Sequence, residues 1–315
     1  MTTPFPLLRL PRLALIPVFQ RMEIIEAIAF SLISRKTHNL SKSLCKTISS
    51  HYIDLEMDIN GLRMRIAVTN GSPLALYFYP DDPKTVGVFY RKRKLQWKNV
   101  GLSPKQSMER VFDITKCPSL NKLVVNGKTD YDVFSVLDVV PKVSELKIYP
   151  NCRNAFSSSI TSFEPSFLNR EEFQRVWMSN VDCLCIYDDD LSSVQFNLND
   201  LLASNAVSLE LSEVPMSLRD LNRFFSCWLN KTSNHRLEHL SVNTFKDINE
   251  DVLLDGLGAT RFTENRTREF RSTNMFPKFT EFTGGFDVRR IDGKLAAITF
   301  GHTFWTTYIN FDVRA

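Results

Sequence analysis

Hydrophobic and polar residues alternate strictly between Ile53 and Val68. The alternation runs on both sides of Asn60-Gly61, a dipeptide that favours a two-residue turn because both turn positions need positive φ. This pattern predicts a β-hairpin with one apolar and one charged face. Counting outward from the turn, we expect Glu56 to face Arg65 across the two strands.

Two more alternating runs follow, from Leu74 to Phe78 and from Val86 to Tyr90. Residues 80–83, with the sequence Pro-Asp-Asp-Pro, separate the two runs and are typical of a turn. We therefore expect an antiparallel sheet of about four strands over residues 51–100.

The first 50 residues have a helical pattern instead. Prolines at positions 6, 11 and 17 disfavour a long helix through Leu7–Ile16, and Pro17 suits the first turn of the helix that follows. A second helix, over residues 23–33, is apolar nearly all round, and a third, more polar helix carries Leu40 and Leu44 on its inner face. Three short helices cannot bury this apolar surface among themselves, so we expect part of it to contact a partner.

From Ser103 onward, strand-like and helical stretches alternate. The pattern predicts strand cores at Leu123–Val125, Leu146–Ile148, Val176–Met178, Leu209–Leu211 and Leu240–Val242, and helices at Asp130–Val140, Leu198–Asn205 and Leu218–Lys231. Ser217 and Asp220 form a capping pair for the last helix. A step of about thirty residues is typical of a degenerate leucine-rich-repeat-like array. A βα arrangement that only resembles such an array is the alternative.

The last part of the chain is β-like again. Alternation around Asp292-Gly293 predicts a hairpin, and Ile309–Val313 predicts a final strand. A terminal sheet of this kind would cover the open edge of the array.

These patterns predict an α+β fold with four regions. They are a three-helix segment at 1–50, an antiparallel β region at 51–100, a repeat-like βα array at 101–280 and a C-terminal β cap at 281–315.

Composition narrows the class of protein. The 315 residues are 43% hydrophobic and 23% charged, as in globular proteins, and the net charge of +4 requires neither a nucleic acid nor a membrane partner. The basic run Arg91–Lys94 is more typical of a solvated turn or strand end than of a binding patch. We expect no signal peptide and no membrane-spanning helix. Six scattered cysteines predict reduced thiols in a cytoplasmic or nuclear protein.

The sequence offers little catalytic chemistry. Cys183-x-Cys185 beside Asp188–Asp190 suggests a metal site, but a single CxC lacks a second ligand pair, so buried thiols are the favoured interpretation. The sequence has no nucleophile elbow, phosphate-binding glycine loop or dinucleotide fingerprint. We expect no enzyme, no metal and no cofactor.

Two stretches carry a resemblance to known families. Leu10-Pro11, then Val18-Phe19, then the run Leu32-Ile33-Ser34-Arg35-Lys36 resembles the F-box, with departures at Pro17 and Thr37. Residues 176–242 are similar to the type 2 F-box-associated domain, most clearly in DLNRF at 220–224 and LEHL at 237–240. The whole chain is therefore similar to nematode F-box proteins that carry this domain.

The resemblance implies a substrate-recognition subunit of a Skp-cullin-F-box ubiquitin ligase, in which other chains supply the chemistry and this chain supplies proximity. The F-box would bind a Skp-family adaptor, and through it a cullin-RING ligase. The residues expected to dock the adaptor are Leu10, Pro11, Val18, Phe19, Leu32 and Ile33. The alternative is an interaction scaffold outside any ligase, with N-terminal helices that pack on its own body.

The second half of the chain would bind an unknown protein substrate. Strand positions that alternate with core residues would line the concave face of an array. On that basis the candidate substrate-binding residues are Lys147, Tyr149, Ser179, Glu210 and Ser241.

Overall fold

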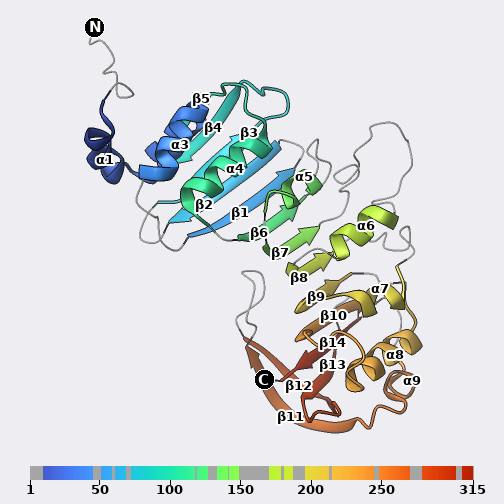
Figure 1. Cartoon of the computed structure of the whole chain (residues 1–315). Helices are drawn as coiled ribbons and strands as arrows, with labels where there is room; N and C mark the ends of the chain where they lie inside the picture. The colour runs from blue at the N-terminus through green and yellow to red at the C-terminus, as the bar shows by residue number, and fades with distance from the viewer. Residues whose placement is uncertain are drawn as a thin grey trace. The chain divides into compact units, whose positions relative to one another are not determined.

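A computed structural model describes residues 10–44, 51–58, 61–68, 72–117, 119–126, 133–140, 142–148, 170–178, 181–186, 196–212, 215–244, 248–269, 279–302 and 307–314. The chain forms two compact units (Figure 1). The first comprises Met1–Leu123 and Asp130–Lys142, and the second comprises Val124–Thr129 and Val143–Ala315.

The first unit begins with the three predicted short helices, α1 (Arg12–Arg21), α2 (Ile24–Ile33) and α3 (Arg35–Leu44). Glu23 begins α2 in a capping box, because its backbone amide donates to the Glu26 carboxylate at 2.8 Å and its side chain accepts from the backbone of residue 26.

The predicted role of Pro17 is wrong. Pro17 lies inside α1, and Pro11 is the residue that precedes the helix. A proline at this position removes one backbone hydrogen bond from the helix, yet Leu15 and Phe19, which flank it, are both buried. Burial of these side chains keeps α1 continuous despite the missing hydrogen bond.

A sheet follows in the first unit, with the strand order β6-β1-β2-β3-β4-β5. Its strands are β1 (His51–Asp58), β2 (Gly61–Val68), β3 (Leu74–Phe78), β4 (Thr85–Tyr90), β5 (Arg93–Lys98) and β6 (Leu120–Val125), of which the residues up to Leu123 belong to this unit. The apolar residues of β1 to β4 share one buried face, as the alternation predicts: Ile53, Leu55, Met57, Leu62, Met64, Ile66, Leu74, Leu76, Phe78, Val86 and Val88.

The β1–β2 hairpin has a different register from the predicted one. Glu56 lies opposite Arg63, and the two side chains form an ion pair of 3.1 Å. Asp58 lies opposite Gly61, which is therefore the first residue of β2. A Cβ on Gly61 would lie 2.1 Å from the backbone oxygen of Phe78 on β3, so glycine serves the approach of a neighbouring strand. The prediction that Glu56 faces Arg65 is wrong, because it treated Gly61 as a turn residue whereas Gly61 is paired within β2.

The fifth strand, β5, was not predicted, because its residues are mostly charged and exposed. Arg91 and Lys92 form the two-residue turn that precedes it, with φ of 47° and 64°. Two positive φ angles are what a type I′ hairpin turn requires. The basic run Arg91–Lys94 is thus a turn and a strand start, as predicted.

Two more helices belong to the first unit, α4 (Pro104–Thr115) and α5 (Val133–Leu137). Figure 1 shows α4 drawn across the strands of the sheet. A capping box formed by Ser103 and Gln106 begins α4, and this S-P-x-Q signal was missed in the sequence. Within the predicted helix Asp130–Val140, the structure describes α5.

The second unit combines a parallel and an antiparallel half. Its strands are β7 (Val143–Ile148), β8 (Val181–Ile186), β9 (Ser208–Leu211), β10 (His239–Thr244), β11 (Thr260–Glu269), β12 (Phe279–Arg289), β13 (Leu295–His302) and β14 (Thr307–Val313). Their order is β7-β8-β9-β10-β14-β13-β12-β11, and β7 to β10 run parallel. The helices are α6 (Arg170–Trp177), α7 (Leu198–Ala203), α8 (Leu218–Leu229) and α9 (Glu250–Leu254).

The last strand, β14, lies between β10 and β13. Phe311 of β14 pairs with Leu240 of β10 and with Ile298 of β13, and its ring stacks on Phe225 at 4.9 Å. Trp228 of α8 meets the same ring edge-on, also at 4.9 Å. This aromatic cluster joins α8 to the sheet, and β14 covers the edge of β10.

Two predictions in this unit need correction. Val176 belongs to α6 and Met178 follows it directly, so the strand predicted there is wrong, and the strand is β8, a few residues later. A short apolar run fits a helix and a strand equally well, and period alone does not separate them. The leucine-rich-repeat interpretation is not confirmed, although parallel strands and helices do alternate from β7 to β10. The sequence analysis also did not predict β11, which lies within the predicted array at 101–280.

Candidate docking site on the N-terminal helices

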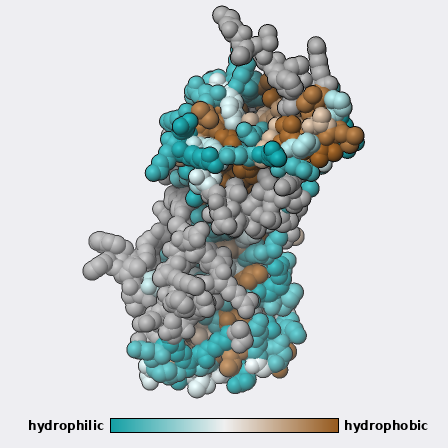
Figure 2. All heavy atoms as spheres, turned by 90° about the vertical axis from the view of Figure 1, so that its left-hand side faces the viewer, coloured by the Kyte–Doolittle hydropathy of each residue, from teal (hydrophilic) through white to brown (hydrophobic). Residues whose placement is uncertain are grey.

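An open groove runs between α1 and α2. It has a volume of about 530 Å³ and is lined by Val18, Arg21, Met22, Glu26, Ala29, Phe30 and Ile33. Val18 is 37% exposed and Ile33 is 54% exposed, and both are among the predicted docking residues. Figure 2 shows hydrophobic surface in the part of the first unit that includes these helices. Exposed aliphatic side chains around a groove are typical of a protein-binding surface.

Phe19, a third predicted docking residue, lies inside the helical segment. It is 1% exposed, and its ring meets Phe30 edge-on at 5.3 Å. With Leu15 and Leu44 it forms the small core that holds α1 against α3. A polar substitution at Phe19 would therefore disrupt the helices themselves.

The remaining docking candidates differ in exposure. Pro11 is exposed, whereas Leu10 and Leu32 are half-buried, and Leu10 packs against the core around Phe19. Leu13, which the sequence did not single out, is 81% exposed on α1. The structure thus brings Val18 and Ile33 together at one groove.

The other side of the helical segment packs on α4. Lys42 lies 2.7 Å from a carboxylate oxygen of Asp113, and His38 lies 3.1 Å from the other oxygen. Arg110 donates to the backbone oxygen of Ser31 at 2.8 Å. Burial lowers the pKa of His38 despite its acidic neighbour. These contacts fasten α2 and α3 to the body of the first unit.

A second connection joins α2 to the β4–β5 turn. Arg91 forms an ion pair of 3.1 Å with Glu23, the residue that caps α2, and the hydroxyl of Tyr90 donates to the same carboxylate. Burial raises the pKa of Tyr90, and its hydrogen bond to Glu23 adds to the increase. These groups are partly exposed, so their energetic contribution is modest.

Three of the five predicted substrate-binding residues lie in one row across the strands of the second unit. Lys147, Glu210 and Ser241 share a row with Cys185, because the parallel pairing aligns Lys147 with Cys185, Cys185 with Glu210, and Glu210 with Ser241. Lys147 is fully buried and Glu210 is 5% exposed, whereas Ser241 is half-buried. Tyr149 and Ser179 lie outside the described residues.

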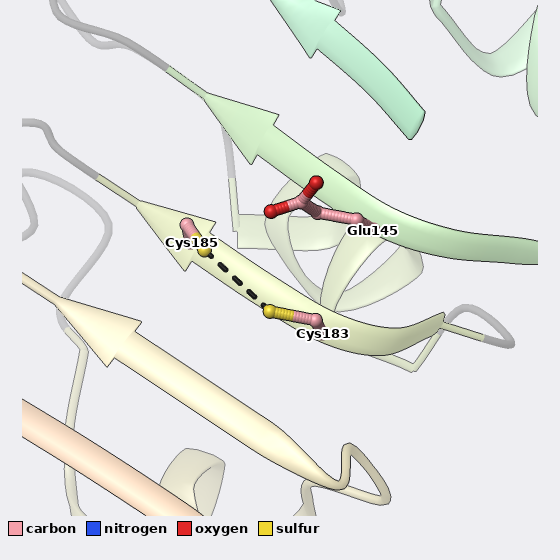
Figure 3. A group of neighbouring side chains, drawn as sticks. All are labelled: Glu145, Cys183 and Cys185. Atoms are coloured by element: carbon pink, nitrogen blue, oxygen red, sulfur yellow. Dashed lines mark hydrogen bonds between the residues drawn. The ribbon is translucent and has the colours of Figure 1, made fainter. Parts of the chain in front are cut away.

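The same face holds the two thiols that the sequence analysis weighed as metal ligands. The sulfurs of Cys183 and Cys185 are 3.7 Å apart, and Glu145 of β7 lies beside them (Figure 3). The sequence did not point to Glu145, which comes from a neighbouring parallel strand. Its carboxylate is already paired with the ammonium of Lys147 at 3.0 Å. The hydrogen bond with Cys183 raises the pKa of Cys185, and burial raises it further.

These groups form a buried polar cluster. Three ligand atoms from Glu145, Cys183 and Cys185 lie close enough to share a cation, but Lys147 supplies the positive charge there. Asp188–Asp190 lie outside the described residues. The cluster therefore supports the prediction of buried thiols.

The N-terminal helical segment keeps the aliphatic side chains of Val18 and Ile33 exposed at a groove. Residues 7–49 match the family model of the F-box domain. Residues 172–242 match the family model described as F-box associated. No curated protein and no solved structure matches the chain.

The two matches confirm the predicted combination of an F-box with an F-box-associated domain. The F-box match contains α1 to α3, and the F-box-associated match runs from α6 into β10. These domains are typical of non-catalytic adaptors that bind a Skp-type subunit and a target, and no catalytic family is indicated. Nematode origin stays a prediction. Among the described helices, none is long and apolar enough to span a membrane.

Proposed function

We propose that the chain is the target-recognition subunit of a Skp-cullin-F-box ubiquitin ligase, in the cytoplasm or the nucleus. The F-box docks a Skp-family adaptor, and the rest of the chain binds the protein to be ubiquitinated. The observation that supports this most directly is the groove between α1 and α2, which keeps Val18 and Ile33 exposed while the other side of α2 packs on α4.

In this role the chain makes no covalent bond itself. It holds a target lysine near the activated ubiquitin that other subunits carry, and the increase in effective concentration accelerates transfer. The candidate target-binding residues remain Lys147, Tyr149, Ser179, Glu210 and Ser241. The burial of Lys147 and Glu210 favours an indirect role for these two, in which they shape the sheet under the surface that a target contacts.

A scaffold outside any ligase is the second candidate. The contacts of α2 and α3 with α4 favour it, because they show that the N-terminal helices do pack on their own body. Within the described residues, these contacts with α4 cover one side of the helices. The groove between α1 and α2 stays open to a partner.

Adaptor binding separates the two functions. We expect the full chain to bind a purified Skp-type adaptor in biolayer interferometry at micromolar concentrations or below. Val18→Asp combined with Ile33→Asp should weaken binding at least tenfold, since each change places a charge in an apolar interface. Both side chains are exposed in the free protein, so its melting temperature should change little.

Ile291→Asp is the matched control, because Ile291 is 71% exposed in the second unit. This variant should keep full affinity for the adaptor. Binding that survives the Val18 and Ile33 changes would contradict the proposed groove, and a folded wild-type chain that ignores every Skp-type adaptor tested would favour the scaffold.

A further inference from the structure

The outermost strand of the first unit, β5, has one edge without a partner strand in the described part of the chain. In the described part of the chain β5 pairs with β4 alone, and β5 is the last strand in the order of that unit. Arg93 closes the two-residue turn opposite Tyr90. Because amides alternate between the two sides of an antiparallel strand, the backbone groups of Lys94, Gln96 and Lys98 face away from β4. These groups can hydrogen-bond to another strand.

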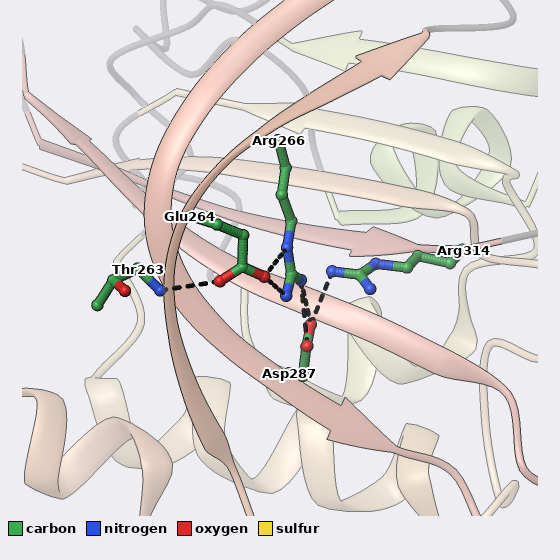
Figure 4. A network of polar contacts seen from close by, with 5 residues as sticks. All are labelled: Thr263, Glu264, Arg266, Asp287 and Arg314. Carbon is green, nitrogen blue, oxygen red and sulfur yellow. Dashed lines mark hydrogen bonds and ion pairs between the residues drawn. The ribbon is translucent and has the colours of Figure 1, made fainter.

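The edge strand of the second unit, β11, is protected by contrast. Its pairing with β12 has a bulge between Phe262 and Asn265, and bulges disrupt the addition of a further strand. Charged side chains of β11 also form ion pairs within the chain. Figure 4 shows Arg266 paired with Glu264 and with Asp287, which lies 2.9 Å away. The pairing of β5 with β4 has no bulge over its six residue pairs.

The side chains of β5 divide into two kinds. Lys94, Gln96 and Lys98 are exposed, and neither lysine forms an ion pair within the described residues. On the other face, Leu95 lies opposite the buried Val88 and is itself 43% exposed. Trp97 on that face is half-exposed. A strand laid beside β5 would thus meet Lys94 and Lys98 on one face. On the other face it would meet Leu95 and Trp97, with the exposed Arg93 at the start of the strand.

We propose that β5 is a docking edge for an extended segment of a target protein in which acidic and apolar residues alternate. This rests on the proposed function and names the class of target that the receptor selects. The segment adds as a further strand, with its acidic side chains beside Lys94 and Lys98 and its apolar side chains beside Leu95 and Trp97. A second copy of β5 is disfavoured there, because it would bring like charges together.

Peptide binding tests the proposal on the full chain without adaptor. Fluorescence anisotropy would follow a labelled peptide of sequence EVEVEVE. We expect binding that weakens as salt is added, and at least tenfold weaker binding of KVKVKVK and of EEEEVVV, which has the composition of the first peptide without its alternation. Equal binding of EEEEVVV would overturn the proposal, since charge alone would then suffice.

Variants of the edge sharpen the test. Gln96→Pro removes an outward amide, which an edge strand tolerates, and should lower affinity for EVEVEVE at least tenfold with the melting temperature kept. Lys94→Glu with Lys98→Glu should shift preference to KVKVKVK. Arg219→Glu, at an exposed position of α8, is the matched control and should change neither.

Two further results would overturn the docking edge. One is a folded Gln96→Pro variant that binds the peptide as tightly as the wild type. The other is tighter binding of a uridine 12-mer than of EVEVEVE, which would identify a nucleic acid surface instead. Because adaptor is absent from this assay, the two proposals fail separately. A wild-type chain that binds adaptor but not EVEVEVE contradicts the edge alone, and one that binds EVEVEVE but no adaptor contradicts the ligase assignment alone.

Discussion

A buried arginine shows how single residues hold the second unit together. Arg290 is 6% exposed and lies over the ring of Trp228 at 4.7 Å. Asp292, two residues later in the β12–β13 turn, accepts from two of its nitrogens at 2.9 Å each. Hydrogen bonds from Arg290 lower the pKa of Asp292, and Lys231 at 3.5 Å acts in the same direction. The cation is thus packed on an aromatic ring and paired as well.

Asp292→Asn should lower the melting temperature at pH 7. The folded-state pKa of Asp292 lies below the ordinary value of 3.8, so its contribution to the free energy of unfolding is present above that value and is lost as the pH falls below it. Melting curves from pH 7 to about pH 2 should therefore show a difference between the variant and the wild type that is constant above 3.8 and shrinks progressively below it. Asp81→Asn, at an exposed carboxylate, is the control. A constant difference across the range would contradict the charge-based account.

At the residue scale, the sequence predicted which side chains share a face of the sheet but not how deeply each of them is buried. It placed Lys147, Glu210 and Ser241 on strand positions that alternate with the core, and the structure aligns them in one row. It could not show that Lys147 is fully buried, because burial depends on what covers the strand. The partner Glu145 follows from parallel pairing across a long stretch of chain, which no local pattern reveals.

Among the elements, α1 is a helix with an interior proline. Pro17 lies in its middle, where it removes a backbone hydrogen bond and crowds the preceding turn. The helix persists because Leu15 and Phe19 are buried against the neighbouring helices. Local propensity is overridden here by packing, which is why the proline was misread as a helix start.

Pro17→Ala should stabilise the chain, since an interior proline costs up to about 3 kcal/mol relative to alanine. Denaturant unfolding at constant pH would measure the gain. Pro17 is exposed, so adaptor affinity should stay within about twofold of the wild type. A loss of stability would show that the proline sets a bend on which the α1 packing depends.

Other elements were predicted with mixed success for physical reasons. Strict alternation identified β1 to β4, and the Ser217–Asp220 capping box identified α8. The register of the first hairpin was missed because Gly61 was taken for a turn residue. The close approach of β3, which leaves no room for a Cβ at position 61, is the actual reason for a glycine there. β5 was missed because exposed edge strands carry charged residues and lose the apolar signal.

On the scale of the whole molecule, the second unit depends on its last strand. His239 of β10 and Asp312 of β14 form a buried pair at 2.7 Å, and Phe311 of β14 completes the aromatic cluster with Phe225 and Trp228. These contacts join residues more than 70 positions apart, so β10 and β13 are not linked into one sheet until β14 is in place between them.

A chain that stops after residue 306 should therefore lose the cooperative unfolding of its second unit. The point variant Phe311→Ala should cost about 3–5 kcal/mol, since it empties a buried aromatic site. Limited proteolysis and tryptophan fluorescence would report both changes. A chain that stops after Val313 keeps β14 and should resist the protease. Wild-type protease resistance in the chain ending at 306 would contradict a central role for β14.

The two-sided use of α2 matters for how a ubiquitin ligase would work. One side of this helix is fastened to α4, and the other side borders the groove. An adaptor bound in the groove would have no flexible linker between itself and the strands of the first unit. A rigid joint limits the volume that a captured protein can sweep, so its acceptor amine would spend more of its time within reach of the thioester that donates ubiquitin.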